Sequence, residues 1–244
     1  MVTIKCKDVA FSNIEAVLFD KNGTLEDSES YLRTLGQKIS RMIDAQIPGI
    51  GEPLLMAFGI NGNFLDPAGL ISVASRRETE IAAAAYIAET GRGWFESLKI
   101  ACQALEEADQ YVGKTPSPLF MGSLEVLQSL SAAGLKLGIL SAATTEDVEK
   151  FVINHQLSDY LQLEKGVDEG PSKPDPALFL EACQALGVAP GATLMVGDSV
   201  GDMQMARDAK AAGCIGITWI GRADNVKGAD VVINQLEEIQ IIED

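Results

Sequence analysis

The stretch of sequence that decides the fold is "AVLFDKNGTLEDS", from Ala16 to Ser28. Four apolar residues end in a lone carboxylate, Asp20, and a turn of Lys-Asn-Gly-Thr follows. Apolar runs without alternation are typical of strands covered on both faces, as in a parallel sheet. Ligands of such sheets bind beyond the carboxyl ends of the strands. The stretch therefore predicts a buried strand that carries Asp20 to a binding edge.

Further short apolar runs follow along the chain, and helical patterns separate them. They are "LKLGILS" (Leu135–Ser141), "ATLMVGD" (Ala192–Asp198), "CIGITW" (Cys214–Trp219) and "DVVI" (Asp230–Ile233). Strand–helix alternation of this kind is typical of an α/β fold with a doubly wound, mainly parallel sheet. We expect that sheet to be built from residues 1–27 and 115–244. The C-terminal "EEIQIIED" is expected to be a solvated helix or tail.

Residues 28–114 break this rhythm and show helical patterns only. The alanine-rich "ETEIAAAAYIAET" and the following "WFESLKIACQALEEA" are examples, with glycine- and proline-containing turns between the helical segments. We expect an inserted all-helical cap domain over 28–114, and "TPSPLF" (Thr115–Phe120) is expected to lead back to the sheet. The alternative is that these helices form part of a single core.

Composition limits the classes of partner. The chain has 244 residues and a net charge of −16, which repels nucleic acids and anionic membrane surfaces. Its four cysteines are far apart and include no CxxC pair, so free thiols in a reducing compartment are expected. No apolar run approaches the ~18 residues of a membrane span. We expect a cytoplasmic protein, a monomer or homodimer, that binds neither nucleic acid nor membrane.

Three polar side chains stand at the carboxyl ends of separate apolar runs: Asp20, Ser141 and Asp198. Each alone could be an ordinary turn former. Because parallel strands end at the same edge of a sheet, the three side chains are expected to meet there. Ser141 and Ala142 also precede a helix start, where free backbone N–H groups bind phosphate well.

Two further charged groups are expected at the same edge. In "SKPDP", Pro174 disfavours helical geometry at the preceding residue and presents the Lys173 ammonium from a stiff loop. In "VGDSVGDMQMA", Asp202 lies four residues after Asp198 around a helix start, so the two carboxylates can face the same side. The expected set is a nucleophilic carboxylate, two more carboxylates for a hard cation, and a hydroxyl and an ammonium for phosphate oxygens.

This set predicts phosphoryl transfer through an aspartyl-phosphate on Asp20. A carboxylate attacks a phosphate dianion readily only when the negative charge is offset. Magnesium takes oxygen ligands and commonly joins protein carboxylates to a substrate phosphate. A lysine stabilises charge on the transferring group in other phosphoryl-transfer sites. Mg²⁺ is therefore the expected cofactor.

The four pieces "FDKNGTL", "LS" at Ser141, "KPDP" at Lys173 and "GDSVGD", in this order, resemble the motifs of the haloacid dehalogenase superfamily of phosphohydrolases. The resemblance implies a Rossmann-like core with a helical cap, closest to the phosphoglycolate-phosphatase-like branch. It implies that Asp20 is both nucleophile and metal ligand, and that the other metal ligands are Asp198, Asp202 and the backbone carbonyl of Asn22. It implies phosphate binding by Ser141, Ala142 and Lys173.

The chain departs from this pattern at Asn22. Phosphatases of the superfamily normally carry a second aspartate there, which protonates the leaving alcohol and then activates water. An amide cannot exchange a proton near neutral pH, and general acid–base assistance is typically worth ~10²–10⁴-fold. At ~1.4 kcal/mol per tenfold, its loss adds roughly 3–5 kcal/mol to the barrier. Binding and metal coordination are expected to survive, while turnover falls.

Several interpretations of Asn22 remain open. One is that the acid/base has been replaced, naturally or by a deliberate Asp→Asn change. Another is a natural enzyme in which a slow phospho-enzyme is useful, an interpretation favoured by the resemblance to the "DKTGT" of P-type ATPases. Hydrolysis of another bond is disfavoured, because dehalogenases need no metal and the Asp198/Asp202 pair is retained. A catalytically silent module that binds phosphate and Mg²⁺ is the main non-enzyme alternative.

The expected substrate is a small phosphorylated metabolite such as phosphoglycolate or a sugar phosphate, by analogy with the nearest branch. In this superfamily the cap contributes contacts to the leaving group. The best candidates in the insert are Arg92 and Trp94 of "TGRGW" (Thr90–Trp94), although a plain helix–helix turn explains that segment equally well.

Overall fold

The computed structural model describes residues 2–112, 116–219 and 223–242. The chain divides into two compact units: Met1–Asp27 with Pro118–Asp244, and Ser28–Ser117. The helical insert was predicted over 28–114. That predicted boundary, and Thr115 at the start of the predicted linker, lie outside the described residues.

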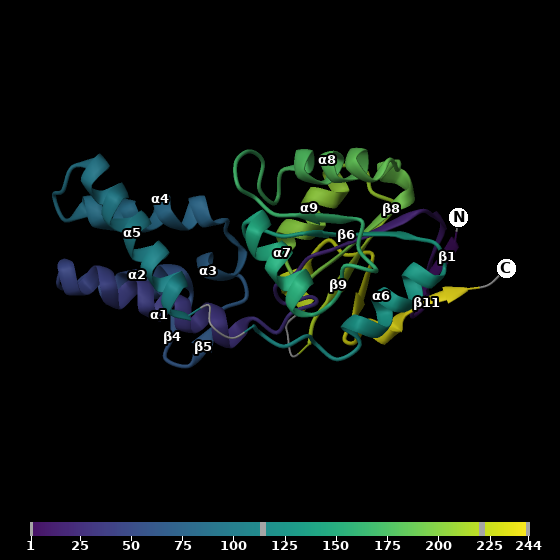
Figure 1. Cartoon of the computed structure of the whole chain (residues 1–244), viewed down its shortest axis with the longest axis horizontal. Helices are drawn as coiled ribbons and strands as arrows, with labels where there is room; N and C mark the ends of the chain where they lie inside the picture. Colours follow the sequence, from purple (N-terminus) through teal and green to yellow (C-terminus); the bar gives the residue numbers. More distant parts are fainter. Residues whose placement is uncertain (1, 113–115, 220–222, 243–244) are drawn as a thin grey trace. The chain divides into compact units, whose positions relative to one another are not determined.

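A six-stranded parallel sheet forms the centre of the first unit, in the order β10-β9-β8-β3-β6-β7 (Figure 1). Its strands are β3 (Ala16–Phe19), β6 (Lys136–Leu140), β7 (Leu163–Lys165), β8 (Thr193–Gly197), β9 (Gly213–Ile217) and β10 (Val231–Ile233). The predicted α/β class with a mainly parallel sheet is confirmed. The edge strand β7 was not predicted, because "LEK" is too short and too polar to give an apolar run.

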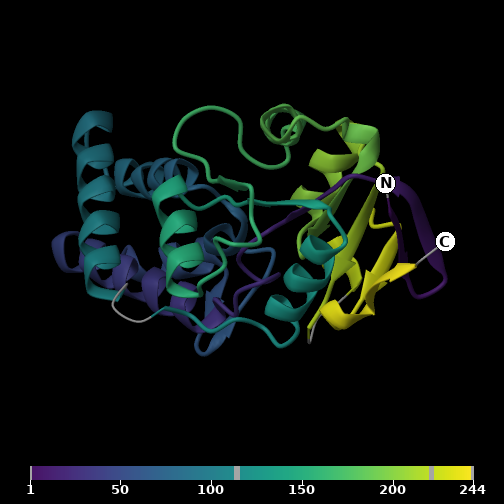
Figure 2. The same cartoon turned by 45° about the vertical axis from the view of Figure 1, so that its right-hand side comes forward.

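Helices cover both faces of this sheet (Figures 1 and 2). They are α6 (Ser123–Ala132), α7 (Thr145–Asn154), α8 (Pro176–Leu186) and α9 (Val200–Asp208). Alternate residues of β3 point to opposite faces. Val17 and Phe19 pack in one cluster with α6 and α7, and Ala16 and Leu18 pack in another with α8 and α9.

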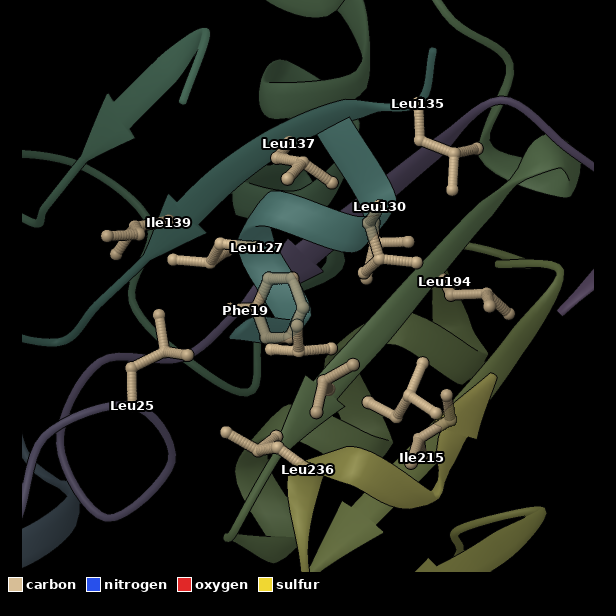
Figure 3. Close-up of a cluster of buried hydrophobic side chains, with 14 of the residues drawn as sticks. Phe19, Leu25, Leu127, Leu130, Leu135, Leu137, Ile139, Leu194, Ile215 and Leu236 are labelled. Carbon is tan, nitrogen blue, oxygen red and sulfur yellow. The ribbon is translucent and has the colours of Figure 1, made fainter. Parts of the chain in front are cut away.

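Figure 3 shows part of the first cluster, where Leu127 and Leu130 of α6 lie against the sheet residues Phe19, Leu194 and Ile215. All five side chains are buried. Burial of one such side chain contributes about 1.5–3 kcal/mol. Strand β3 is therefore fixed by packing on both of its faces, directly before Asp20.

A second, three-stranded antiparallel sheet was not predicted. It consists of β1 (Val2–Cys6), β2 (Val9–Ile14) and β11 (Ile239–Ile242), in the order β11-β1-β2. The expectation that the C-terminal segment is a solvated helix or tail is therefore wrong for Ile239–Ile242. Alternate isoleucines there pair with β1, and the acidic residues around them concealed this short strand in the sequence.

The second unit is built mainly from helices, as expected. They are α1 (Glu29–Gln46), α2 (Gly51–Phe58), α3 (Leu70–Val73), α4 (Arg76–Glu89) and α5 (Trp94–Val112), and they enclose their own buried cluster. The prediction of helix alone missed a small hairpin of β4 (Ile60–Asn61) and β5 (Phe64–Leu65). Gly62 at the first loop position has φ +60°, which suits a two-residue hairpin turn. Within the described residues, none of the helices has the length and apolarity needed to cross a membrane.

Candidate active site

Three neighbouring strands deliver the predicted polar residues to one edge of the sheet. Phe19 at the end of β3 pairs with Ile139 of β6 and with Val196 of β8. Asp20 follows directly, and its backbone N–H donates to the Val196 carbonyl at 2.8 Å. Ser141 directly follows the end of β6, and Asp198 directly follows the end of β8. The shared carboxyl edge predicted from the sequence is therefore present.

The three aspartates form one cluster at this edge. Asp20, Asp198 and Asp202 each offer a carboxylate oxygen, and these oxygens lie within 4.8 Å of one another. Lys173 joins two of them, because its Nζ lies 2.5 Å from Asp20 Oδ1 and 2.6 Å from Asp202 Oδ1. Its side chain is only 6% exposed. The ammonium predicted to project from a stiff loop is thus held between two carboxylates.

Burial and charge set the protonation of this cluster. Burial raises the pKa of Asp20 to about 6, with the charge of Asp202 adding to the effect and Lys173 opposing it. Burial, and then the charges of Asp20 and Asp202, raise the pKa of Asp198 well above its usual range. Burial alone would lower the pKa of the Lys173 ammonium, but the two carboxylates raise it overall. The single ammonium of Lys173 therefore does not balance the negative charge of the three buried carboxylates.

The residues present fit a divalent cation. Three carboxylates against one ammonium leave a formal charge of −2 when all four groups are ionised. Buried charges are strongly unfavourable unless they are paired or coordinate a metal. An all-oxygen donor set of carboxylates is the type that Mg²⁺ takes. Asp20, Asp198 and Asp202 are therefore the side chains that would hold it.

Two glycines allow the carboxylates to lie this close to the backbone. Gly23 has φ +75°, and a Cβ at this position would collide with the Asp198 carboxylate. A Cβ at Gly197 would collide with the side chain of Asp202. Both positions therefore require glycine for space, and Gly23 also for its left-handed backbone.

The start of α9 fixes Asp202. Ser199 is the N-cap and forms a capping box, in which its hydroxyl donates to Asp202 Oδ2 at 2.6 Å and accepts from the Asp202 N–H at 3.2 Å. Asp202 is fully buried. Because Oδ2 is held by Ser199, Oδ1 is the oxygen directed to Lys173.

The predicted phosphate-binding residues Ser141 and Ala142 lie between β6 and α7. The Ser141 N–H donates to the Lys165 carbonyl at 3.0 Å, and its hydroxyl accepts from the Ala143 N–H at 3.2 Å. Ser141 is 1% exposed, whereas Ala142 is partly exposed. Their role toward phosphate stays a prediction.

A buried ion pair next to Asp20 was not predicted from the sequence. Lys21 Nζ lies 2.5 Å from Glu26 Oε2, and both side chains are less than 10% exposed. The same ammonium donates to Asn22 Oδ1 at 2.6 Å and lies 5.5 Å from the ring centre of Phe151. The only hint in the sequence was that two opposite charges lie five residues apart. That spacing indicates an ion pair only when the backbone between them is known to form a turn.

Trp219 makes both a packing contact and a hydrogen bond at this edge of the sheet. Its ring stacks on Phe120 with centroids 4.2 Å apart, and its indole N–H donates to the Gly23 carbonyl at 3.0 Å. Trp219 thereby holds the turn that places Gly23 against Asp198. Its position just beyond β9, at the same carboxyl edge, was the signal that could have indicated this.

Trp219→Phe should keep the stacking but lose the hydrogen bond to Gly23. One such bond contributes about 0.5–1.5 kcal/mol, so we expect the free energy of unfolding to fall by that amount in urea denaturation. Affinity for Mg²⁺ should fall as well, because the Gly23 turn loses its anchor. Phe120→Leu is the matched control, since it removes the stacking and leaves the indole N–H. A Trp219→Phe variant with unchanged Mg²⁺ affinity would show that Trp219 only packs.

Arg92 and Trp94, the candidates for contacts with the leaving group, belong to the second unit. Arg92 donates to the Thr90 hydroxyl at 2.8 Å, and its Nε lies 3.8 Å from Glu96. Trp94 begins α5 and is 44% exposed. Their contact with a substrate stays a prediction.

Most of the chain, including the acidic cluster, matches a known protein family. Residues 14–210 match the haloacid dehalogenase-like hydrolase family, and that range includes every residue of the acidic cluster. The chain belongs to this family. The family resemblance inferred from the four motifs is therefore confirmed.

Relatives of this haloacid dehalogenase-like hydrolase include a phosphoglycolate phosphatase from Chromobacterium violaceum, 30% identical over 93% of the chain and 95% of the relative. An N-acetylmuramic acid 6-phosphate phosphatase from Pseudomonas putida is 26% identical over 95% and 96%. The crystal structure of a predicted phosphoglycolate phosphatase from Haemophilus somnus superposes with a TM-score of 0.69, at 20% identity over 92% of this chain and 96% of that one. The last comparison supports the fold.

Proposed function

We propose that this chain is a Mg²⁺-dependent phosphohydrolase of small phosphorylated metabolites that works through an aspartyl-phosphate on Asp20. The observation that carries the proposal is the cluster of Asp20, Asp198 and Asp202 with Lys173 inside it, at the carboxyl edge of the sheet. A lone carboxylate after a strand is common, but three converging carboxylates with one buried ammonium are suited to phosphoryl transfer.

Each residue has a distinct part in the proposed reaction. An Asp20 oxygen attacks phosphorus, and the bond from phosphorus to the leaving oxygen breaks. Lys173, already in contact with Asp20, offsets negative charge on the transferring group. Ser141 and the backbone at Ala142 bind phosphate oxygens. Mg²⁺, when bound by the three aspartates, would neutralise and orient the phosphate. Water then attacks the aspartyl-phosphate and releases inorganic phosphate and free Asp20.

The relatives guide the choice of substrate. Their names specify phosphoglycolate and N-acetylmuramic acid 6-phosphate, two small phosphate monoesters. We propose phosphoglycolate or a sugar phosphate as the first substrates to test. The resemblance to phosphoglycolate phosphatases supports this choice. Which leaving group the chain accepts depends on residues outside the acidic cluster.

Asn22 is proposed to slow this reaction. By the resemblance to the superfamily's first motif, its amide occupies the position of a second aspartate, and an amide neither gives nor takes a proton near neutral pH. Binding of Mg²⁺ and phosphate depends on other groups and should be intact. The change can be natural or engineered. If turnover is absent altogether, the same site would make the chain a module that binds phosphate and Mg²⁺.

The proposal predicts slow, Mg²⁺-dependent phosphate release from a panel of phosphorylated metabolites, lost with a chelator. Thermal unfolding should shift upward with Mg²⁺, because a ligand that binds only the folded state stabilises it. Asp198→Asn is the matched variant and should lose both effects. Phosphate release that is indifferent to chelator would overturn the proposed chemistry. Mg²⁺ stabilisation without any release would favour the binding module.

A further inference from the structure

The orientation of the Asn22 amide is determined by Lys21. The ammonium can only donate, so the oxygen of the amide, and not its nitrogen, must be the atom 2.6 Å away. The other arm of the planar amide, with its two N–H groups, is then turned away from Lys21. Residue 22 therefore offers hydrogen-bond donors that are held in place, but no proton that it can give up.

Lys21 is a poor substitute for the missing acid. It donates both to Asn22 and to Glu26, and the Lys21–Glu26 pair is buried. Two of its N–H groups are therefore already engaged, one of them by the buried Glu26 carboxylate. Lys173 is similarly held between Asp20 and Asp202. Among the described residues around Asp20, the site thus presents positive charge for a phosphoryl group, and residue 22 supplies hydrogen-bond donors but no carboxylic acid for a leaving group.

The need for that proton depends on the donor molecule. An alkyl phosphate releases an alkoxide, a strong base comparable with hydroxide. An acyl phosphate releases a carboxylate, whose conjugate acid has a pKa of about 4. The first leaving group must be protonated as the bond to phosphorus breaks, whereas the second leaves as a stable anion.

We propose that the effective phosphoryl donors of this chain are acyl phosphates, and that the chain accumulates as the aspartyl-phosphate. The inference rests on the proposed transfer to Asp20. An Asp20 oxygen forms a bond to phosphorus, the bond to the donor's carboxylate oxygen breaks, and the electron pair leaves with that carboxylate. One acyl phosphate replaces another, so the exchange is nearly neutral in free energy. Hydrolysis of the product lacks a base at Asn22 and is slow.

The test compares acetyl phosphate with phosphoglycolate as donors to the full chain in the presence of Mg²⁺. Intact-mass spectrometry after an acid quench follows the gain of one phosphoryl group, and peptide mapping locates it. We expect acetyl phosphate to label Asp20 at least ~10²-fold faster than phosphoglycolate, because general acid catalysis is worth that much to the alkyl ester. Asn22→Asp should reduce this ratio, because it restores a group at residue 22 that can protonate the leaving oxygen.

The outcomes separate the two proposals. Equal labelling by both donors would overturn the preference for acyl phosphates and leave the proposed phosphohydrolase in place. Labelling by neither donor would overturn the proposed function itself. Label that persists in Asp20→Ala, or that forms without Mg²⁺, would show non-specific transfer and overturn the inference.

His155, the single histidine of the chain, supplies a further control. Its ring packs 5.0 Å from that of Phe151, on which Lys21 also lies. His155→Gln should leave labelling by both donors unchanged. A selective loss of labelling by phosphoglycolate would make His155 the proton donor and overturn the inference.

Discussion

Asp20→Ala should abolish both phosphorylation of the chain and Mg²⁺-dependent phosphate release. The variant lacks the proposed attacking oxygen and one of the three clustered carboxylates, and removal of a nucleophile costs most of an enzyme's rate. The same loss is expected when Asn22→Asp is also present, because an acid/base cannot act without an intermediate. Release of phosphate from either variant would rule out the covalent route.

Asp20→Asn is the matched control for folding. In metal-free protein burial raises the pKa of Asp20 to about 6, so its ionised form costs stability near neutral pH. That cost is full above the folded pKa and disappears below the ordinary value of about 4. Without Mg²⁺ we therefore expect Asp20→Asn to unfold at a higher temperature than the parent near neutral pH. The difference should vanish at low pH. An inactive variant with raised stability shows that its loss of activity is chemical.

The fold was largely predictable from local sequence signals, and the reason is topological. Parallel strands buried on both faces leave strong apolar runs, and β3, β6, β8, β9 and β10 were recognised from them. The short, polar strand β7 and the strand β11 of the antiparallel sheet leave weaker patterns. Their pairing depends on partners far along the chain, which no local pattern reveals.

The candidate site was predictable to a smaller extent. Position at the end of a strand indicated Asp20 and Asp198, but no local pattern indicated that Lys173 contacts both Asp20 and Asp202. The Lys21–Glu26 pair and the bond from Trp219 to Gly23 depend on the path of a turn and on a contact 196 residues apart. Such contacts are products of the fold and lie beyond sequence patterns.

Asn22→Asp should raise Mg²⁺-dependent phosphate release from an aryl phosphate at least tenfold. The full contribution of general acid–base catalysis is ~10²–10⁴-fold, or roughly 3–5 kcal/mol of barrier. Asn22→Ala is the control, because it removes the amide without adding a carboxyl group, and it should show no gain. An unchanged rate in Asn22→Asp would contradict the role assigned to this position.

The gain from Asn22→Asp should differ between the two steps of the reaction. The introduced carboxylate would replace an amide oxygen that lies 2.6 Å from Lys21 Nζ. A nearby positive charge favours the ionised carboxylate, which suits the base that activates water more than the acid that protonates a leaving group. Rapid-quench kinetics should therefore show a burst of aryl leaving group in the parent chain, limited by hydrolysis of the aspartyl-phosphate. That burst should disappear in Asn22→Asp as hydrolysis accelerates more than transfer. A burst of undiminished size would place the effect of Asn22 on the first step instead.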